Sequence, residues 1–128
     1  MGHGDELAIV DGNFPVTALA RRLVHLSTIS AADALDAILT VFPLDTVAKP
    51  AAMTMRVIGH PNDVPEPVPD FAAVLKRHSE ASVALGDLER EAFYERARNA
   101  FAIVRTADLR PYRNILLVKG VVNEYRGR

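Results

Sequence analysis

The stretch ELAIVDGNFP (residues 6–15) decides the fold. Its residues 7–10 form a continuous apolar run between polar ends, which is typical of a short strand covered on both faces. The next residues, Gly12 to Pro15, have the composition of a loop. Two side chains that can do acid–base chemistry, His3 and Asp11, therefore flank one predicted buried strand.

Outside this stretch, strand-like and helix-like patterns alternate. Apolar runs and apolar–polar alternation predict further strands at residues 21–26, 53–58, 101–104 and 115–122. Apolar residues at helical spacing predict helices over residues 30–42, 70–78 and 91–100, whereas residues 81–88 fit either element. This alternation predicts the α/β class: a single compact domain with a central, mostly parallel sheet flanked by helices.

Two helix boundaries carry a local signal. Ser30 is followed three residues later by Asp33, close to a capping box, and Pro43 is expected to stop the helix that begins there. Asp70 is the expected cap of the next helix. Four prolines lie between Gly59 and Asp70, so we expect an extended surface connection there.

Length and composition exclude several classes of protein. A chain of 128 residues, 49% hydrophobic and 24% charged, fits one globular domain, residues 1–128. The net charge of −1 gives no attraction for nucleic acid. The absence of Cys excludes disulfides and thiolate chemistry, and no apolar run approaches the roughly 20 residues of a membrane span. With no signal peptide visible, we expect a soluble, cytoplasmic protein that binds no membrane.

No general catalytic or metal-binding motif stands out. The four histidines are dispersed and no pair has metal-ligand spacing, so no metal site is expected. His25, His60 and His78 are interpreted as ordinary surface or packed residues. The sequence contains no P-loop, nucleophile elbow or dinucleotide fingerprint. The charged run at residues 90–98 fits a solvated helix face, and residues 112–114 place polar groups at the mouth of a strand.

Four segments taken together resemble a known family. They are GHGDE at residues 2–6, DGNFP at 11–15, FYERA at 93–97 and YRNILLVKGV at 112–121. In this order and spacing they resemble the ribose pyranase and fucose mutarotase family over nearly the whole chain. The resemblance is closest to the L-fucose mutarotase branch, since the ribose branch is expected to carry a histidine where Arg90 stands.

The resemblance implies a sugar mutarotase. Such an isomerase interconverts the α and β anomers of a free monosaccharide, here L-fucose or a related sugar, through the open-chain aldehyde. It implies that His3 is the proton donor and Tyr112 a second acid–base group. A histidine suits this chemistry because its unperturbed pKa of about 6.5 allows proton transfer in both directions near neutrality. No metal or organic cofactor is implied.

Sugar binding is implied for five residues: Asp11, Arg90, Tyr112, Arg113 and Asn114. The carboxylate of Asp11 can accept hydroxyl hydrogen bonds, Arg90 can donate to two oxygens, and Asn114 can donate and accept. Arg113 is expected to contribute its backbone. Apart from the resemblance, Asp11 also fits a turn former and Arg90 a surface ion pair, so both alternatives stay open at this stage.

The family also implies a homo-oligomer, a decamer of two stacked pentamers with sites near subunit contacts. Relatives have a helical segment before the glycine–histidine motif. Met1 lies directly before that motif here, so we expect this N-terminal helix to be missing. The alternatives are a ribose-type pyranase, a non-catalytic monosaccharide-binding oligomer and an interaction protein without a sugar site. Sugar binding and anomer exchange distinguish them.

Overall fold

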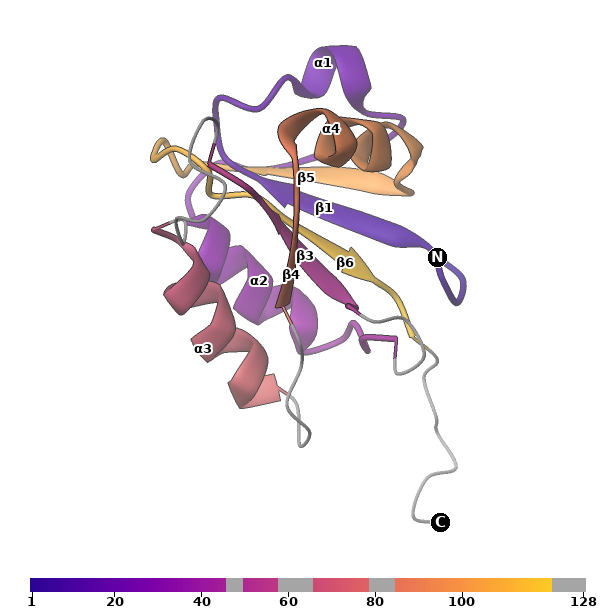
Figure 1. The fold of residues 1–128 in the computed structure, drawn as a ribbon, viewed down its shortest axis with the longest axis vertical. Helices are drawn as coiled ribbons and strands as arrows, with labels where there is room; N and C mark the ends of the chain where they lie inside the picture. Colours follow the sequence, from indigo (N-terminus) through magenta and orange to yellow (C-terminus); the bar gives the residue numbers. More distant parts are fainter. Residues whose placement is uncertain (46–49, 58–65, 79–84, 121–128) are drawn as a thin grey trace.

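A computed structural model describes residues 1–45, 50–57, 66–78 and 85–120, and it has one sheet with helices on both faces (Figure 1). The strands are β1 (Glu6–Val10), β2 (Leu23–Leu26), β3 (Ala52–Met55), β4 (Leu85–Leu88), β5 (Ala102–Thr106) and β6 (Ile115–Val118). The helices are α1 (Val16–Leu19), α2 (Ala31–Leu39), α3 (Val68–His78) and α4 (Arg90–Asn99).

The sheet is mostly parallel. Its strand order is β2-β5-β1-β6-β3-β4. The pairs β2–β5, β5–β1 and β3–β4 are parallel, while β6 runs antiparallel to both of its neighbours, β1 and β3. The predicted α/β class with a mostly parallel sheet flanked by helices is therefore confirmed.

β1 lies inside the sheet and is covered on both faces. Leu7 and Ile9 belong to the core shared with α2 and α3, whereas Ala8 and Val10 belong to the core shared with α1 and α4. Figure 1 shows these two pairs of helices on opposite sides of the sheet. The apolar run of β1 is continuous because its alternating side chains pack against helices on both faces of the sheet.

The start of α2 follows its sequence signal. The Ser30 hydroxyl accepts a hydrogen bond of 3.1 Å from the backbone N–H of Asp33, as an N-cap does. The helix ends at Leu39, before Pro43 could act as the stop. Beyond its last turn, the hydroxyl of Thr40 donates to the Asp36 carbonyl, and Phe42 is still buried in the core.

Two sequence predictions need correction. α3 begins at Val68 and not at Asp70, so the extended connection predicted through Asp70 is wrong for its last residues. Pro69 is tolerated because the first turn of a helix has N–H groups without intrahelical partners. The short helix α1 lies after the predicted loop and was not expected. Residues 58–65 of the predicted connection lie outside the described residues.

The strand boundaries also differ from the predicted ones. β3 covers Ala52–Met55, and all four of its side chains are buried. Residues 56–57 of the strand predicted at 53–58 lie beyond its end, and residue 58 lies outside the described residues. Both of its faces are covered, because Ala52 belongs to the core shared with α2 and α3, whereas Met53 and Met55 belong to the core shared with α1 and α4. Its apolar–polar alternation in the sequence therefore did not indicate an exposed face. The ambiguous segment contains strand β4, and β6 ends at Val118, with residues 121–122 of the prediction outside the described range.

Candidate functional site

Several strand ends meet at one edge of the sheet. Since β6 is antiparallel to β1 and β3, the carboxyl ends of β1 and β3 lie where β6 begins. Asp11 follows β1, Met55 ends β3 and Asn114 precedes β6. α4, which begins at Arg90 directly after β4, starts at the same edge. In open α/β sheets, ligands usually bind outside the carboxyl ends of the strands.

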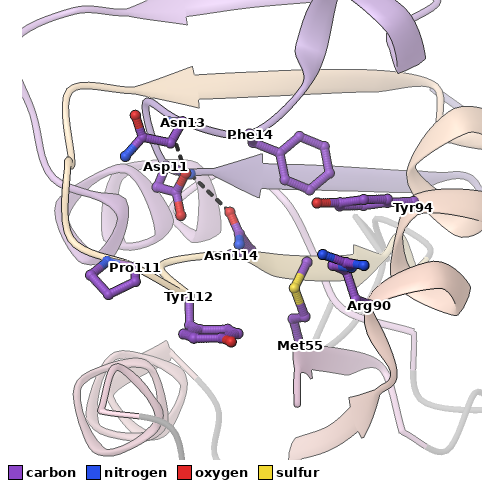
Figure 2. A pocket seen from close by; sticks show the side chains of 9 residues that line it. All are labelled: Asp11, Asn13, Phe14, Met55, Arg90, Tyr94, Pro111, Tyr112 and Asn114. Carbon is purple, nitrogen blue, oxygen red and sulfur yellow. Dashed lines mark hydrogen bonds between the residues drawn. The ribbon is translucent and has the colours of Figure 1, made fainter. Parts of the chain in front are cut away.

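A pocket of about 280 Å³ opens at this edge. This volume lies just below the range of roughly 300–1,000 Å³ for small-molecule sites. The described residues that line it, drawn in Figure 2, are Asp11, Asn13, Phe14, Met55, Arg90, Tyr94, Pro111, Tyr112 and Asn114. The structure thus brings together four residues that the sequence analysis singled out: Asp11, Arg90, Tyr112 and Asn114.

Asp11 and Asn114 are locked to each other. The backbone N–H of Asp11 donates a 2.9 Å hydrogen bond to Oδ1 of Asn114, and both residues are buried (Figure 2). The carboxylate of Asp11 in turn accepts a 2.9 Å hydrogen bond from the backbone N–H of Asn13. Because the amide oxygen of Asn114 serves the backbone, its NH₂ is the group it can offer to a ligand. Asp11 is therefore both a turn former and a pocket residue.

The pKa of Asp11 is raised above its ordinary value of 3.8. Burial is the main cause, since it disfavours the charged carboxylate, and the negative charge of Asp108 acts in the same direction. Hydrogen bonds from the backbone N–H groups of Asn13, Arg113 and Phe14 oppose this effect. The carboxylate is thus held in a partly dehydrated pocket wall by backbone donors.

Tyr112 has an unusual backbone conformation. Its φ of 60° lies in the left-handed region, which a residue with a bulky side chain rarely adopts. Such backbone conformations cost of order 1–3 kcal/mol and persist where the surrounding structure holds them. The turn at Pro111 and Tyr112 directs the chain from the sheet edge back into β6, with the Tyr112 ring beside the pocket (Figure 2).

One wall of the pocket is apolar. Phe14 contacts the ring of Tyr94 edge to face, with centroids 5.2 Å apart, and the ring of Phe93 at 5.9 Å. Met55 lies beside them at the end of β3. Phe14 and Tyr94 lie in the DGNFP and FYERA segments of the sequence. Only this position indicated that they could belong to a functional site. Nothing in the sequence indicated such a role for Met55, which was only placed in a predicted strand.

Arg90 is at the rim of the pocket. Its side chain is 47% exposed, and its Nε lies 3.5 Å from a carboxylate oxygen of Glu91. Its guanidinium carbon is 6.0 Å from the centre of the Tyr94 ring. The two interpretations of Arg90, surface ion pair and pocket residue, therefore both apply. An exposed ion pair of this kind contributes little to stability, so Arg90 can turn to a ligand at small cost.

The structure does not bring His3 to this pocket. His3 lies before β1 in a turn in which the N–H of Asp5 donates to the Gly2 carbonyl and Gly4 has a φ of +84°. Its exposed imidazole Nε2 is 3.3 Å from a carboxylate oxygen of Asp45. The five residues of β1, about 17 Å at 3.3–3.4 Å per residue, separate this turn from the pocket in the same copy of the chain.

Arg113 does not line the pocket with its side chain, although it lies between two residues that do. Its side chain is only 2% exposed and forms ion pairs with Glu66 and Asp70. Among the described parts of the chain, no group of three or more His, Asp or Glu side chains could hold a metal ion. No helix within the described ranges is long and apolar enough to cross a membrane.

Comparison with known proteins agrees with this architecture. FucU from Bifidobacterium longum is 42% identical, with 96% of this chain and 89% of that one covered and a TM-score of 0.87. The fucose mutarotase from Streptococcus pneumoniae, solved in complex with L-fucose, is 35% identical, with 96% and 87% covered and a TM-score of 0.88. Bacillus subtilis RbsD, solved with D-ribose, is 17% identical over 96% and 87% of the two chains at a TM-score of 0.73, and so shares the fold.

The family assignment rests on nearly the whole chain. The model of one family matches residues 1–122, which include every strand and helix described above and all the residues of the pocket. The chain therefore belongs to the RbsD / FucU transport protein family.

Proposed function

We propose that this protein is a sugar mutarotase that interconverts the α and β anomers of L-fucose or a related free monosaccharide. The observation that carries the proposal is the group formed by Asp11, Arg90, Tyr112 and Asn114 around one small pocket at the carboxyl edge of the sheet. The similarity to a fucose mutarotase at 35% identity supports the reaction and the sugar class.

The pocket has the polar groups that a sugar requires. Asp11 accepts hydrogen bonds from hydroxyl groups, and the Asn114 amide and the Arg90 guanidinium donate to sugar oxygens. The apolar wall of Phe14 and Met55 suits the C–H face of a pyranose and the methyl group of a 6-deoxy sugar such as L-fucose. Binding therefore orients the ring with its hydroxyl groups toward Asp11.

Anomer exchange is an acid–base reaction. A proton is added to the ring oxygen while the anomeric hydroxyl loses one, and the C–O bond of the ring breaks to give the aldehyde. Rotation of the carbonyl and the reverse proton transfers close the ring as the other anomer. In this proposal Tyr112 exchanges a proton at the pocket and His3 is the proton donor.

His3 must then come from a second copy of the chain. Within one copy it lies at the opposite end of β1 from Asp11. We therefore propose a homo-oligomer in which the turn that contains His3 reaches the pocket of a neighbouring copy. The same separation favours a second candidate, a pocket that binds a monosaccharide without converting it.

Saturation-transfer NMR of equilibrated L-fucose tests the proposal. We expect exchange between the α and β anomeric protons to be faster than in buffer, and this acceleration to be lost in Asp11→Asn. The matched control is Asp33→Asn, an exposed aspartate in the first turn of α2 that should keep the wild-type rate.

The outcomes separate the candidates. Acceleration with D-ribose but not L-fucose would favour a ribose-type pyranase. Saturable binding without faster exchange would favour the binding-only role. A folded protein that neither binds nor converts either sugar would refute the proposed function.

A further inference from the structure

Arg113 connects the pocket loop to α3. Its guanidinium donates from Nη1 to Asp70 at 3.0 Å and from Nη2 to Glu66 at 3.2 Å. Asp70 is in the first turn of α3 and Glu66 just precedes that helix. The Arg113 side chain is 2% exposed, whereas those of its two partners are 57% and 78% exposed. An arginine from the sheet edge is thus buried beneath two solvated carboxylates.

The main chain of the same residue forms part of the pocket. The backbone N–H of Arg113 lowers the pKa of the Asp11 carboxyl, against the effect of burial. On either side of it lie Tyr112, with its left-handed φ of 60°, and Asn114, which holds the backbone of Asp11. A displacement of Arg113 would therefore move all three pocket residues at once.

We propose that the Arg113 guanidinium is a positioning element: by fixing the loop to Glu66 and Asp70, it keeps Tyr112, Asn114 and the carboxylate of Asp11 in the geometry that binds the sugar. Arg113 is not a catalytic residue in this proposal, because its side chain does not line the pocket. The role in sugar binding rests on the proposed function, whereas the positioning of Asp11 can be measured without any sugar.

Because both partners of Arg113 are exposed, its side chain can be replaced without leaving a buried unpaired charge. Replacing a buried ion pair by an apolar side chain of similar volume is often neutral for stability, because burying a charge costs about as much as the pairing returns. In Arg113→Met the two carboxylates that remain are already solvated. We therefore expect this variant to fold while its loop loses the connection to α3.

Lysine should restore only part of the connection. The planar guanidinium reaches Asp70 and Glu66 through two different nitrogens, while the ammonium of lysine is a single point charge. In the wild type, the two terminal nitrogens of Arg113 make both contacts. The buried Nε of Arg113 has no partner among the described residues. Arg113→Lys is therefore the conservative variant, and it should show an intermediate effect.

The experiment compares Arg113→Met and Arg113→Lys with the wild type. Arg96→Met is the matched control, because Arg96 forms a two-bond ion pair with Glu6 at the opposite end of β1. The sugar-independent measurement is the titration of the Asp11 carboxyl, followed by ¹³C NMR. A displacement of the backbone N–H at position 113 away from Asp11 should raise the pKa of Asp11 further, since burial and the charge of Asp108 are then less opposed.

The sugar-dependent measurement is the affinity for L-fucose. We expect Arg113→Met to weaken it about tenfold, as expected for the loss of one charge-assisted contact. Arg113→Lys should lie between Arg113→Met and the wild type, and Arg96→Met should resemble the wild type in both measurements.

Two results would overturn the positioning role: a folded Arg113→Met variant with an unchanged Asp11 titration, or an equal change in Arg96→Met. If Arg113→Met does not fold, the double variant Glu66→Gln/Asp70→Asn removes the two anchors and leaves Arg113 itself in place. An unchanged Asp11 titration there would overturn the proposal in the same way. If the wild type binds no sugar but its Asp11 titration responds to Arg113→Met, the proposed function fails and the positioning of Asp11 stands.

Discussion

At the level of single residues, Asp11 combines two properties that oppose each other in most carboxylates. It is buried, which raises its pKa, and it accepts several backbone hydrogen bonds, which lower it. The net increase means that Asp11 takes up a proton at a higher pH than an exposed aspartate does. Sugar binding that uses the carboxylate as acceptor must then depend on pH in the acidic range.

We expect the affinity for L-fucose to fall as the pH falls through the raised pKa of Asp11, above its ordinary value of 3.8. The protonated carboxyl loses a charge-assisted hydrogen bond, which is worth about 1.5–3 kcal/mol, or at least roughly tenfold in affinity. NMR titrations of the sugar in a His3→Ala background measure this loss without the titration of that imidazole.

Asp108 is the other acid that acts on Asp11, and it stays charged because its pKa is about 2. In Asp11→Asn the affinity should be weak and independent of pH. A wild-type affinity that stays constant between pH 7 and pH 3.8 would contradict the role of Asp11 as an acceptor.

The residues of the pocket could be predicted only where they stand in a motif or at the end of a predicted strand. Asp11 and Asn114 lie 103 positions apart, and their contact depends on the antiparallel pairing of β6 with β1, which local sequence patterns do not contain. Met55 had no signal for the same reason. Conversely, His3 stands in a motif, yet no local pattern could tell which end of β1 faces the pocket.

At the level of helices and strands, sequence patterns predicted an element correctly where its burial or its cap leaves a local signal. The apolar run of β1 and the cap of α2 were predicted because burial on both faces and a Ser–Asp spacing leave local signals. α1 has only four residues, so no periodic pattern can develop. The start of α3 was missed because proline, which is unfavourable inside a helix, is tolerated in the first turn.

α2 also depends on a residue from the far end of the chain. The carboxylate of Asp108, whose side chain is 2% exposed, accepts a hydrogen bond of 3.2 Å from the backbone N–H of Ala31. Two hydrogen bonds of 2.9 Å from the Arg110 guanidinium lower the pKa of Asp108 to about 2, against the opposing effect of burial. Asp108 therefore links the first turn of α2 to the loop before β6.

We predict that Asp108→Asn destabilises the fold by roughly 1–2 kcal/mol at neutral pH, a value reduced because Arg110 is half exposed. The folded-state pKa is lowered, so this stability is present above the unfolded value of 3.8 and is lost as the pH falls through about 2. Urea unfolding at several pH values should show the two proteins converging at the acid end. A difference that persists at low pH, or an equal loss in the exposed control Asp33→Asn, would count against this account.

At the level of the whole molecule, the two chemically active regions lie at opposite ends of the sheet. The pocket is at the carboxyl end of β1 and the turn with His3 is at its amino end. On the edge strand β2, Leu23 and Val24 are 38% and 46% exposed, although edge strands in single copies are usually kept polar. An assembly of copies would cover such residues and could bring His3 of one copy to the pocket of the next.

Mixing two inactive variants tests this arrangement. We expect His3→Ala and Asp11→Asn each to lose the acceleration of L-fucose exchange. In assemblies formed from equal amounts of both, a site that takes its pocket from one copy and its histidine from another is intact in about one quarter of cases. Exchange should therefore recover to roughly that fraction of the wild-type rate after the variants are unfolded together and refolded. If both halves of the site belonged to one copy, the mixture would stay inactive. If His3 took no part in proton transfer, His3→Ala alone would already exchange the anomers at the wild-type rate.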